Sequence, residues 1–288
     1  MFRRSIYKSP VELSSMVTAG EVTAAALAEA RSMIVPGATP LDLDAAAERV
    51  IRAAGGRPNF QLVPGYRHTL CVSVDDDVVH GIPGERPFRP GDIVSVDGGA
   101  EVDGWNGDSA FTVVLPDPER PEVVASRTEL SRVTEQALWL GIATLARARH
   151  LNEVGAAMEE YLESEGDPST GSGHRYGVLT DYVGHGIGRS MHEEPPVFNY
   201  RVDRRGPAVK PGLVVAIEPM IVGGSIDTFT RDDEWTVTTS DGSDAAHWEH
   251  SVAVHADGIW VLTAPDGGAA GLAPFGVRPS PIARSSRP

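Results

Sequence analysis

The sequence predicts an α+β fold built from two similar halves, each with two helices followed by antiparallel strands, the helices covering one face of the sheet. A segment made of a basic residue, Pro-Gly, an apolar strand and an acid occurs twice, as RPGDIVSVD over residues 89–97 and as KPGLVVAIE over residues 210–218. Two predicted helices precede each copy. Because the two nine-residue segments correspond down to the final acid, a duplication is favoured, and it places Asp97 and Glu218 at equivalent points around a pseudo-two-fold axis.

The helices of the first half are predicted from their start signals. Residues 9–12 (SPVE) and 39–42 (TPLD) each combine a capping hydroxyl, a proline in the first turn and an acid three residues after the cap. In the second half the spacing of apolar residues predicts two more helices. These cover residues 122–149 and 152–165, the second capped by Asn152.

The segment from residue 88 to 114 is typical of a β-hairpin. Residues 93–97 and 109–114 are rich in β-branched side chains, and a connection rich in Gly and Asp separates them. If residues 101–104 form the turn, Asp97 lies directly opposite Asp108, with Cβ atoms about 4.5–5.5 Å apart. Two carboxylates that close repel each other unless a proton or a cation lies between them. The pair therefore predicts half of a metal site.

Composition limits the class of protein. The chain has 25 basic and 40 acidic residues, a net charge of −15, which argues against nucleic acid or an anionic membrane as the main partner. Cys71 is the only cysteine, so no disulfide framework or zinc knuckle is expected. The N-terminus lacks the apolar core of a signal peptide, and we expect a cytoplasmic protein with no membrane segment. Residues 1–263 are predicted to form one domain, and residues 264–288, without periodicity, a disordered tail.

Five side chains at strand ends or beside glycines are candidate metal ligands. Four carboxylates and one imidazole suit Mn²⁺, Fe²⁺, Co²⁺ or Zn²⁺, and two ions rather than one, because carboxylates can bridge. Two ions about 3.5–4 Å apart would acidify a water for hydrolysis. His80 and His192 add imidazoles that titrate near neutrality and either reach into a cleft or lie on the surface. The five candidates are Asp97, Asp108, His185, Glu218 and Glu249.

Five motifs are specific enough to indicate a family. The chain resembles the bacterial form of the type I methionine aminopeptidases, which have the pita-bread fold, over about residues 9–263. The motifs occur in the order of that family. They are VVHGIP (78–83), VDGGAEVDGWNGDSA (96–110), YVGHGIGRSMHEEP (182–195), IEPM (217–220) and HWEHSV (247–252).

The resemblance implies a division of labour among the five ligands. Asp97 would chelate one divalent ion, and His185 and Glu218 would bind the other. Asp108 and Glu249 would bridge the two ions. The resemblance leaves the metal open among Co, Mn, Fe and Zn.

The resemblance also implies catalytic roles. Glu218 would act as general base toward the water between the ions. His80 would contact the substrate nitrogen and shuttle protons. His192 would donate to the developing oxyanion, an electrostatic contribution that is usually large.

A methionine side chain requires an apolar, polarisable pocket. By similarity Tyr66, Cys71 and Trp235 would line it, with Met191 where relatives commonly carry an aromatic residue. Two of these positions also have a plain structural interpretation: Cys71 as a small core hydrophobe, and Trp235 as ordinary sheet packing.

The implied reaction is removal of the initiator methionine from nascent polypeptides whose second residue is small, with their N-termini met at the ribosome. We expect a monomer. The nearest alternative is another pita-bread metallopeptidase, an Xaa-Pro aminopeptidase or prolidase; the other is an inactive pita-bread module that only binds. Residues 75–77 (DDD) and Ala245 depart from the family pattern at positions that resemble a monovalent-cation site, which puts that ion in doubt.

Overall fold

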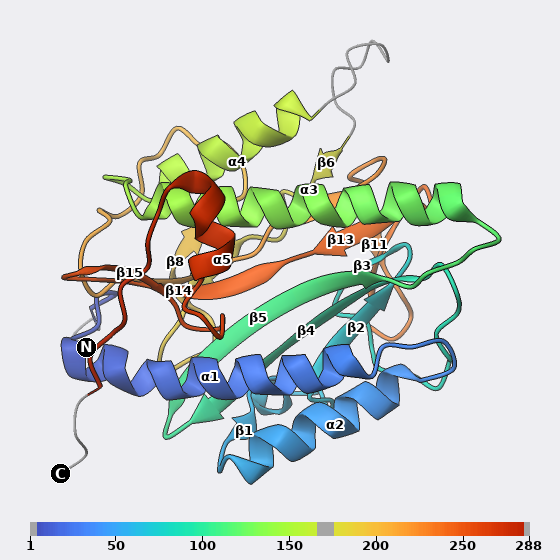
Figure 1. Cartoon of the computed structure of the whole chain (residues 1–288), viewed down its shortest axis with the longest axis horizontal. Helices are drawn as coiled ribbons and strands as arrows, with labels where there is room; N and C mark the ends of the chain where they lie inside the picture. Colours follow the sequence, from blue (N-terminus) through green and yellow to red (C-terminus); the bar gives the residue numbers. More distant parts are fainter. Residues whose placement is uncertain (1–4, 166–175, 285–288) are drawn as a thin grey trace.

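The structure, a computed structural model, describes residues 5–165 and 176–284. Four long helices form two pairs, α1 with α2 and α3 with α4, and α1 and α3 pack on the same curved antiparallel sheet (Figure 1). This confirms the predicted α+β arrangement of two helix pairs on a sheet. The helices are α1 (Pro10–Ser32), α2 (Pro40–Ala53), α3 (Pro121–Leu145), α4 (Asn152–Ser164) and the short α5 (Ala269–Leu272).

The helix starts follow the predicted caps in the first half but not at α4. Ser9 and Thr39 each form a complete capping box with the acid three residues later. At α4, Leu151 rather than Asn152 is the capping position, and its side chain makes no cap bond. The Glu153 carboxylate binds the free backbone N–H groups there instead, accepting from the two residues before Leu151 at 3.0 and 2.8 Å.

The main sheet joins the two halves. Within the described residues it has nine strands, in the order β1-β4-β5-β14-β9-β7-β8, with β2 added on β4 and β15 on β14. Strand β14 lies between β5 of the first half and β9 of the second. The strands are β1 (Arg57–Pro58), β2 (Leu70–Val74), β4 (Ile93–Val102), β5 (Trp105–Val114), β7 (Gly184–Gly186), β8 (Glu193–Val197), β9 (Val214–Ile217), β14 (Glu249–His255) and β15 (Gly258–Val261).

Two small sheets complete the described fold, β13-β10-β6 and β11-β12-β3. They lie where the strands of the two halves continue beyond the main sheet. Their strands are β3 (Asp77–Val79), β6 (Gly177–Val178), β10 (Met220–Val222), β11 (Thr228–Thr230), β12 (Val237–Thr239) and β13 (Ala245–His247). The described residues contain no helix that is long and apolar enough to cross a membrane.

The predicted β4–β5 hairpin is present, but its predicted register is wrong. Val102 pairs with Trp105, so only Asp103 and Gly104 form the turn, both at positive φ (51° and 77°). Such a two-residue Asp-Gly turn matches the twist of the strands. The pairing shifts by two residues relative to the prediction: Asp97 lies opposite Ala110. Asp97 and Asp108 remain on the same face of the hairpin as diagonal neighbours.

The structure differs from the predicted disordered tail as far as residue 284. Leu272 of α5 is fully buried, and Gly271 lies so close to the Trp139 ring of α3 that a Cβ would come within 2.2 Å of it. Ser280 pairs with the β14–β15 edge through its N–H to the Ile259 carbonyl at 2.9 Å. Small residues allow this close packing, and their lack of periodicity conceals it in the sequence.

Candidate active site

The five predicted metal ligands come from five consecutive strands of the main sheet. In the order β4-β5-β14-β9-β7, each strand carries one ligand within it or directly after its end. Of the two acids that end the repeated segment, Asp97 lies within β4 and Glu218 directly follows β9. In strand order the ligands are Asp97, Asp108, Glu249, Glu218 and His185.

The ligand atoms converge, and several have no other partner. One ligand atom from each of Asp108, His185 and Glu249 lies within 4.8 Å of the others, and His185 Nε2 is 3.4 Å from Glu218 Oε1. Three buried oxygens lack a hydrogen-bond partner within the described structure: Asp97 Oδ1, Asp108 Oδ1 and Glu249 Oε1. Buried polar atoms are normally satisfied. This cluster of unsatisfied oxygens therefore fits divalent cations.

The electrostatics of the cluster agree with a cation site. Burial raises the pKa of the Asp108 carboxyl from 3.8 to about 7. Burial, with the negative charges of Asp108 and Glu218 added, raises the pKa of Asp97 well above its usual value. The pKa values of Glu218 and Glu249 are raised by burial and by neighbouring carboxylates in the same way. So many carboxylates remain ionised together only when positive charge is supplied.

His185 is oriented by the glycines on either side of it. A Cβ at Gly184 would lie 2.4 Å from the Ala216 carbonyl oxygen, and one at Gly186 2.2 Å from the Glu194 carbonyl oxygen. Only glycine allows β7 to approach β9 and β8 this closely. His185 Nδ1 lies 3.0 Å from the Gly186 carbonyl, a contact that requires Nδ1 to carry the proton. Nε2 is then left as the free lone pair that a metal would need.

The two further predicted histidines lie on the wall of the same cavity, which has a volume of about 170 Å³. His80 follows β3 with φ 59°, and its ring contacts that of Tyr182. His192 is at the exposed mouth, edge to face with His185 at a centroid distance of 4.4 Å. Desolvation lowers the pKa of both His80 and His192, which keeps both rings neutral near pH 7.

The predicted pocket residues line the apolar side of this cavity. The Tyr66 hydroxyl donates to the Leu70 carbonyl at 2.7 Å and contacts Cys71 Sγ at 3.2 Å. Burial raises the pKa of the Cys71 thiol, so it stays a neutral, polarisable wall atom. The Trp235 ring meets Tyr66 edge to face at 5.0 Å, and Met191 lies in the same lining. Their roles toward a substrate stay predictions.

Three lining residues and one neighbour were not predicted. Phe60, Val63 and Val79 also line the cavity. The first two lie in the segment after α2, where no periodicity marks them, although their nearness to Tyr66 in sequence was a signal. His247 Nε2 is buried without a hydrogen-bond partner, 3.8 Å from Glu218 Oε2. Burial, with the nearby His80 adding to it, lowers the pKa of His247 to about 3.

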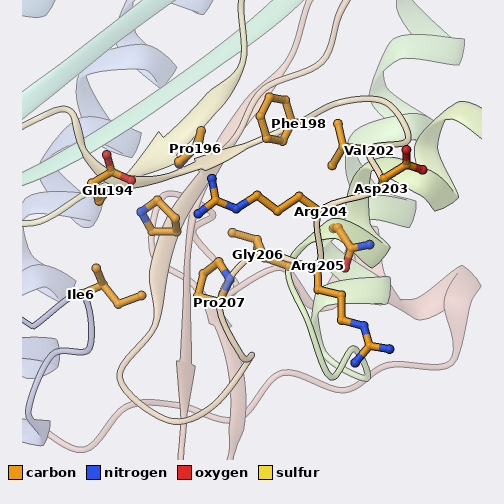
Figure 2. A pocket seen from close by; sticks show the side chains of 13 residues that line it. Ile6, Glu194, Pro196, Phe198, Val202, Asp203, Arg204, Arg205, Gly206 and Pro207 are labelled. Carbon is orange, nitrogen blue, oxygen red and sulfur yellow. The ribbon is translucent and has the colours of Figure 1, made fainter.

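A larger cavity, about 980 Å³, lies elsewhere and has a different character. It is lined by Pro195, Pro196, Phe198 and the loop that follows β8, and Figure 2 shows the Arg204 side chain extending across it. No histidine is part of its lining in the described structure. The convergent carboxylates and imidazoles, rather than the larger volume, mark the candidate active site.

The side chains at the doubtful monovalent-cation position do not fit such an ion. The Asp75 carboxylate is 2.7 Å from Arg127 Nη1, and the Asp77 carboxylate is 2.6 Å from Arg231 Nη2. Ala245 offers no side-chain oxygen. Arg127 and Arg231 supply the positive charge next to these two aspartates.

Known proteins of similar sequence are methionine aminopeptidases. Over 260 residues the chain is 43% identical to methionine aminopeptidase 1 of Mycobacterium tuberculosis, covering 89% of this chain and 94% of that protein. It is 38% identical over 258 residues to methionine aminopeptidase 1 of Bacillus subtilis, covering 90% of this chain and 98% of that protein.

Solved structures agree. The methionine aminopeptidase of Thermotoga maritima superposes with a TM-score of 0.81 at 37% identity, covering 91% of this chain and 99% of that one. The prolidase of Pyrococcus furiosus shares the pita-bread fold at 19% identity, with a TM-score of 0.67 over 90% of this chain and 65% of that one. Residues 14–256 match metallopeptidase family M24, and the chain belongs to that family.

Proposed function

We propose that this chain removes the N-terminal methionine from polypeptides by hydrolysing the first peptide bond. The proposal rests on one observation: two kinds of side chain line different parts of one cavity. One side is a cluster of carboxylates and imidazoles, and the other is a polarisable wall with Tyr66, Cys71, Met191 and Trp235. A methionine side chain on that wall would bring its own peptide bond beside the cluster. The relatives named methionine aminopeptidase support the same choice.

The five ligands would hold two divalent ions, with Asp108 and Glu249 as bridges and Asp97, His185 and Glu218 as terminal ligands. When bound, such ions supply Lewis acidity and lower the pKa of water at the site. Co²⁺, Mn²⁺, Fe²⁺ and Zn²⁺ all suit this donor set, so metal availability decides among them.

Three residues of the chain would move or stabilise charge. Glu218, whose carboxylate lies beside the other predicted ligands, would act as general base toward the water at the site. His80, with its pKa lowered by burial, is neutral and able to accept and return a proton at the substrate nitrogen. His192, neutral for the same reason, would donate its N–H to the scissile carbonyl oxygen as negative charge develops there.

Several finer points belong to the same proposal. The second residue of the substrate would have to be small, because it would lie against the ligand cluster. The substrates would be nascent polypeptides, met at the ribosome in the cytoplasm, and the chain would act as a monomer. The net charge of −15 argues against direct binding to nucleic acid.

The test is a rate comparison on metal-depleted protein with Mn²⁺, Co²⁺, Fe²⁺ or Zn²⁺ added back. The substrates are Met-Ala-Ser, Met-Leu-Ser and Ala-Pro-Ala peptides. We expect free methionine from Met-Ala-Ser only after metal is added, and much slower release from Met-Leu-Ser. Cleavage of the proline peptide alone would assign the chain to the Xaa-Pro branch. No cleavage with any metal would support a module that only binds.

A further inference from the structure

Arg127 of α3 makes an unusually complete set of contacts for a residue outside the cavity. Its side chain is only 13% exposed. Nε and Nη2 bind both oxygens of Asp244 at 3.0 and 2.7 Å, and Nη1 lies 2.7 Å from Asp75 Oδ1 and donates to the Gly91 carbonyl at 2.7 Å. All three nitrogens of the guanidinium are used. Such a planar, two-pronged ion pair fixes orientation as well as distance.

The first partner, Asp75, lies in the turn between β2 and β3, two residues before β3 begins. This residue has φ 61°, and His80, directly after β3, has φ 59°. Left-handed conformations of residues other than glycine persist only where the surroundings enforce them. Asp75 is enforced from several sides: its N–H donates to the Ile93 carbonyl at 2.9 Å, and its carbonyl accepts from Ala245 N at 3.0 Å. Arg127 holds its side chain.

The second partner, Asp244, directly precedes β13. This strand ends at His247, whose unpartnered Nε2 lies 3.8 Å from Glu218 Oε2. Asp75 thus lies two residues before β3 and Asp244 directly before β13, and each of these short strands leads to one histidine near the cluster. A single guanidinium joins the two aspartates.

We propose that Arg127 is a positioning residue for the active site: it fixes β3 relative to β13 and thereby the placement of His80 and His247. The inference builds on the proposed function for what His80 does, but the placement of both histidines is measurable without it. An error of about 1 Å in a reacting group can cost about 10²-fold in rate. Arginine is required because lysine is a point charge that cannot bind Asp244 with two parallel bonds and reach Asp75 as well.

The test compares Arg127→Met and Arg127→Lys with a control, Arg132→Met. Arg132 lies on the same helix and also bridges two acids, Glu129 and Glu165, but it is exposed and remote from the cavity. For each full-length variant, kcat and KM are measured on Met-Ala-Ser with metal bound. Histidine ring signals are recorded by NMR with zinc bound and without metal, and assigned with His80→Gln and His247→Gln.

We expect Arg127→Met to lower kcat by about 10- to 100-fold with little change in KM, and to shift the ring signals of His80 and His247. Arg127→Lys should recover part of both effects, and Arg132→Met should show neither. Unchanged kcat and unchanged ring signals, with only a lower melting temperature, would overturn the proposal. If Arg127→Met does not fold, Arg127→Lys and Asp244→Asn decide by the same criteria. If the wild-type protein releases no methionine, the proposed function fails, while the ring signals still test positioning.

Discussion

The base of the cavity holds carboxylates and its wall holds histidines. Burial shifts the pKa values of these two groups in opposite directions. At the base, burial raises the pKa of Asp97, Asp108 and Glu249, so the carboxylates resist ionisation. On the wall, burial lowers the pKa of His80 and His192, so the imidazoles resist protonation. The physical cause is the same, because a charge is costly away from water.

The two regions differ in what relieves that cost. A neutral imidazole carries no charge, so burial imposes no ionisation cost on it. The carboxylates are left with unpartnered oxygens at 8%, 3% and 2% exposure for Asp97, Asp108 and Glu249. Where these carboxyl groups are ionised together, relief must come from bound cations. The carboxylates at the base of the cavity therefore depend on metal for their stability, whereas the histidines on its wall do not.

Loss of a carboxylate at the base of the cavity should have the largest effect on activity. We expect Asp108→Ala to abolish peptide hydrolysis, by more than the roughly 10- to 100-fold that outer-shell changes at metal sites cost, and to weaken peptide binding less. Bound metal and kcat/KM on Met-Ala-Ser are the measurements. Asp257→Ala, which removes an exposed carboxylate in the β14–β15 turn, is the control. Full activity of Asp108→Ala would show that the site assignment is wrong.

Loss of a wall imidazole should have the next largest effect. Removing one donor to a developing oxyanion typically costs about 10²–10³-fold in kcat, and we expect this for His192→Ala with little change in metal content. Metal analysis alongside steady-state kinetics separates this outcome from the previous one. Equal losses of metal in His192→Ala and Asp108→Ala would contradict the distinction between the histidines on the wall and the carboxylates at the base of the cavity.

Changes in the apolar lining should act on substrate affinity. Trp235→Ala removes part of the apolar lining beside Tyr66. We therefore expect KM for Met-Ala-Ser to rise by about tenfold while kcat changes less. Phe229→Ala removes an aromatic ring that is 52% exposed on β11 and serves as the control. Unchanged KM and kcat, with only a lower melting temperature, would instead place Trp235 in ordinary sheet packing.

The sequence singled out five side chains that the structure brings together, because each acid lies within a strand or at its end and His185 stands between two glycines. The predicted register of the hairpin was wrong by two residues because the turn was placed over residues 101–104, whereas Asp103 and Gly104 alone form it. The Asp103-Gly104 pair was the available signal, since both positions have positive φ. Phe60, Val63 and His247 could not be assigned from pattern alone, because what brings them to the cavity is tertiary packing.

The C-terminal segment shows the limit of composition as a guide. Residues 264–284 are rich in Gly, Ala and Pro, which indicated disorder. Leu272 is nevertheless fully buried, and its small neighbours allow α5 to approach Trp139. Two buried apolar side chains, Leu272 and Val277, with close-packed small residues around them leave no periodic signal. The arginine contacts at Asp75 and Asp244 are equally invisible in the sequence, because Arg127 is far from both along the chain.

The smallest expected effect concerns the stability of the metal-free protein. Burial raises the folded-state pKa of Asp108 from 3.8 to about 7, so its stabilising contribution is present below pH 3.8 and is lost as the pH rises to about 7. We therefore expect metal-free Asp108→Asn to melt a few degrees above the wild-type protein at pH 8. The gain should shrink toward pH 5.

The histidines do not disturb this comparison, because both proteins carry the same ones and their contributions cancel in the difference. Calorimetry at pH 5, 6, 7 and 8 gives the measurement. With Zn²⁺ added the order should reverse, since the wild-type protein keeps the ligand that Asp108→Asn has lost and a bound ion stabilises only the folded state. A difference in melting temperature that is constant across pH would mean that Asp108 is ionised in the metal-free fold, and that the base does not depend on metal for its stability.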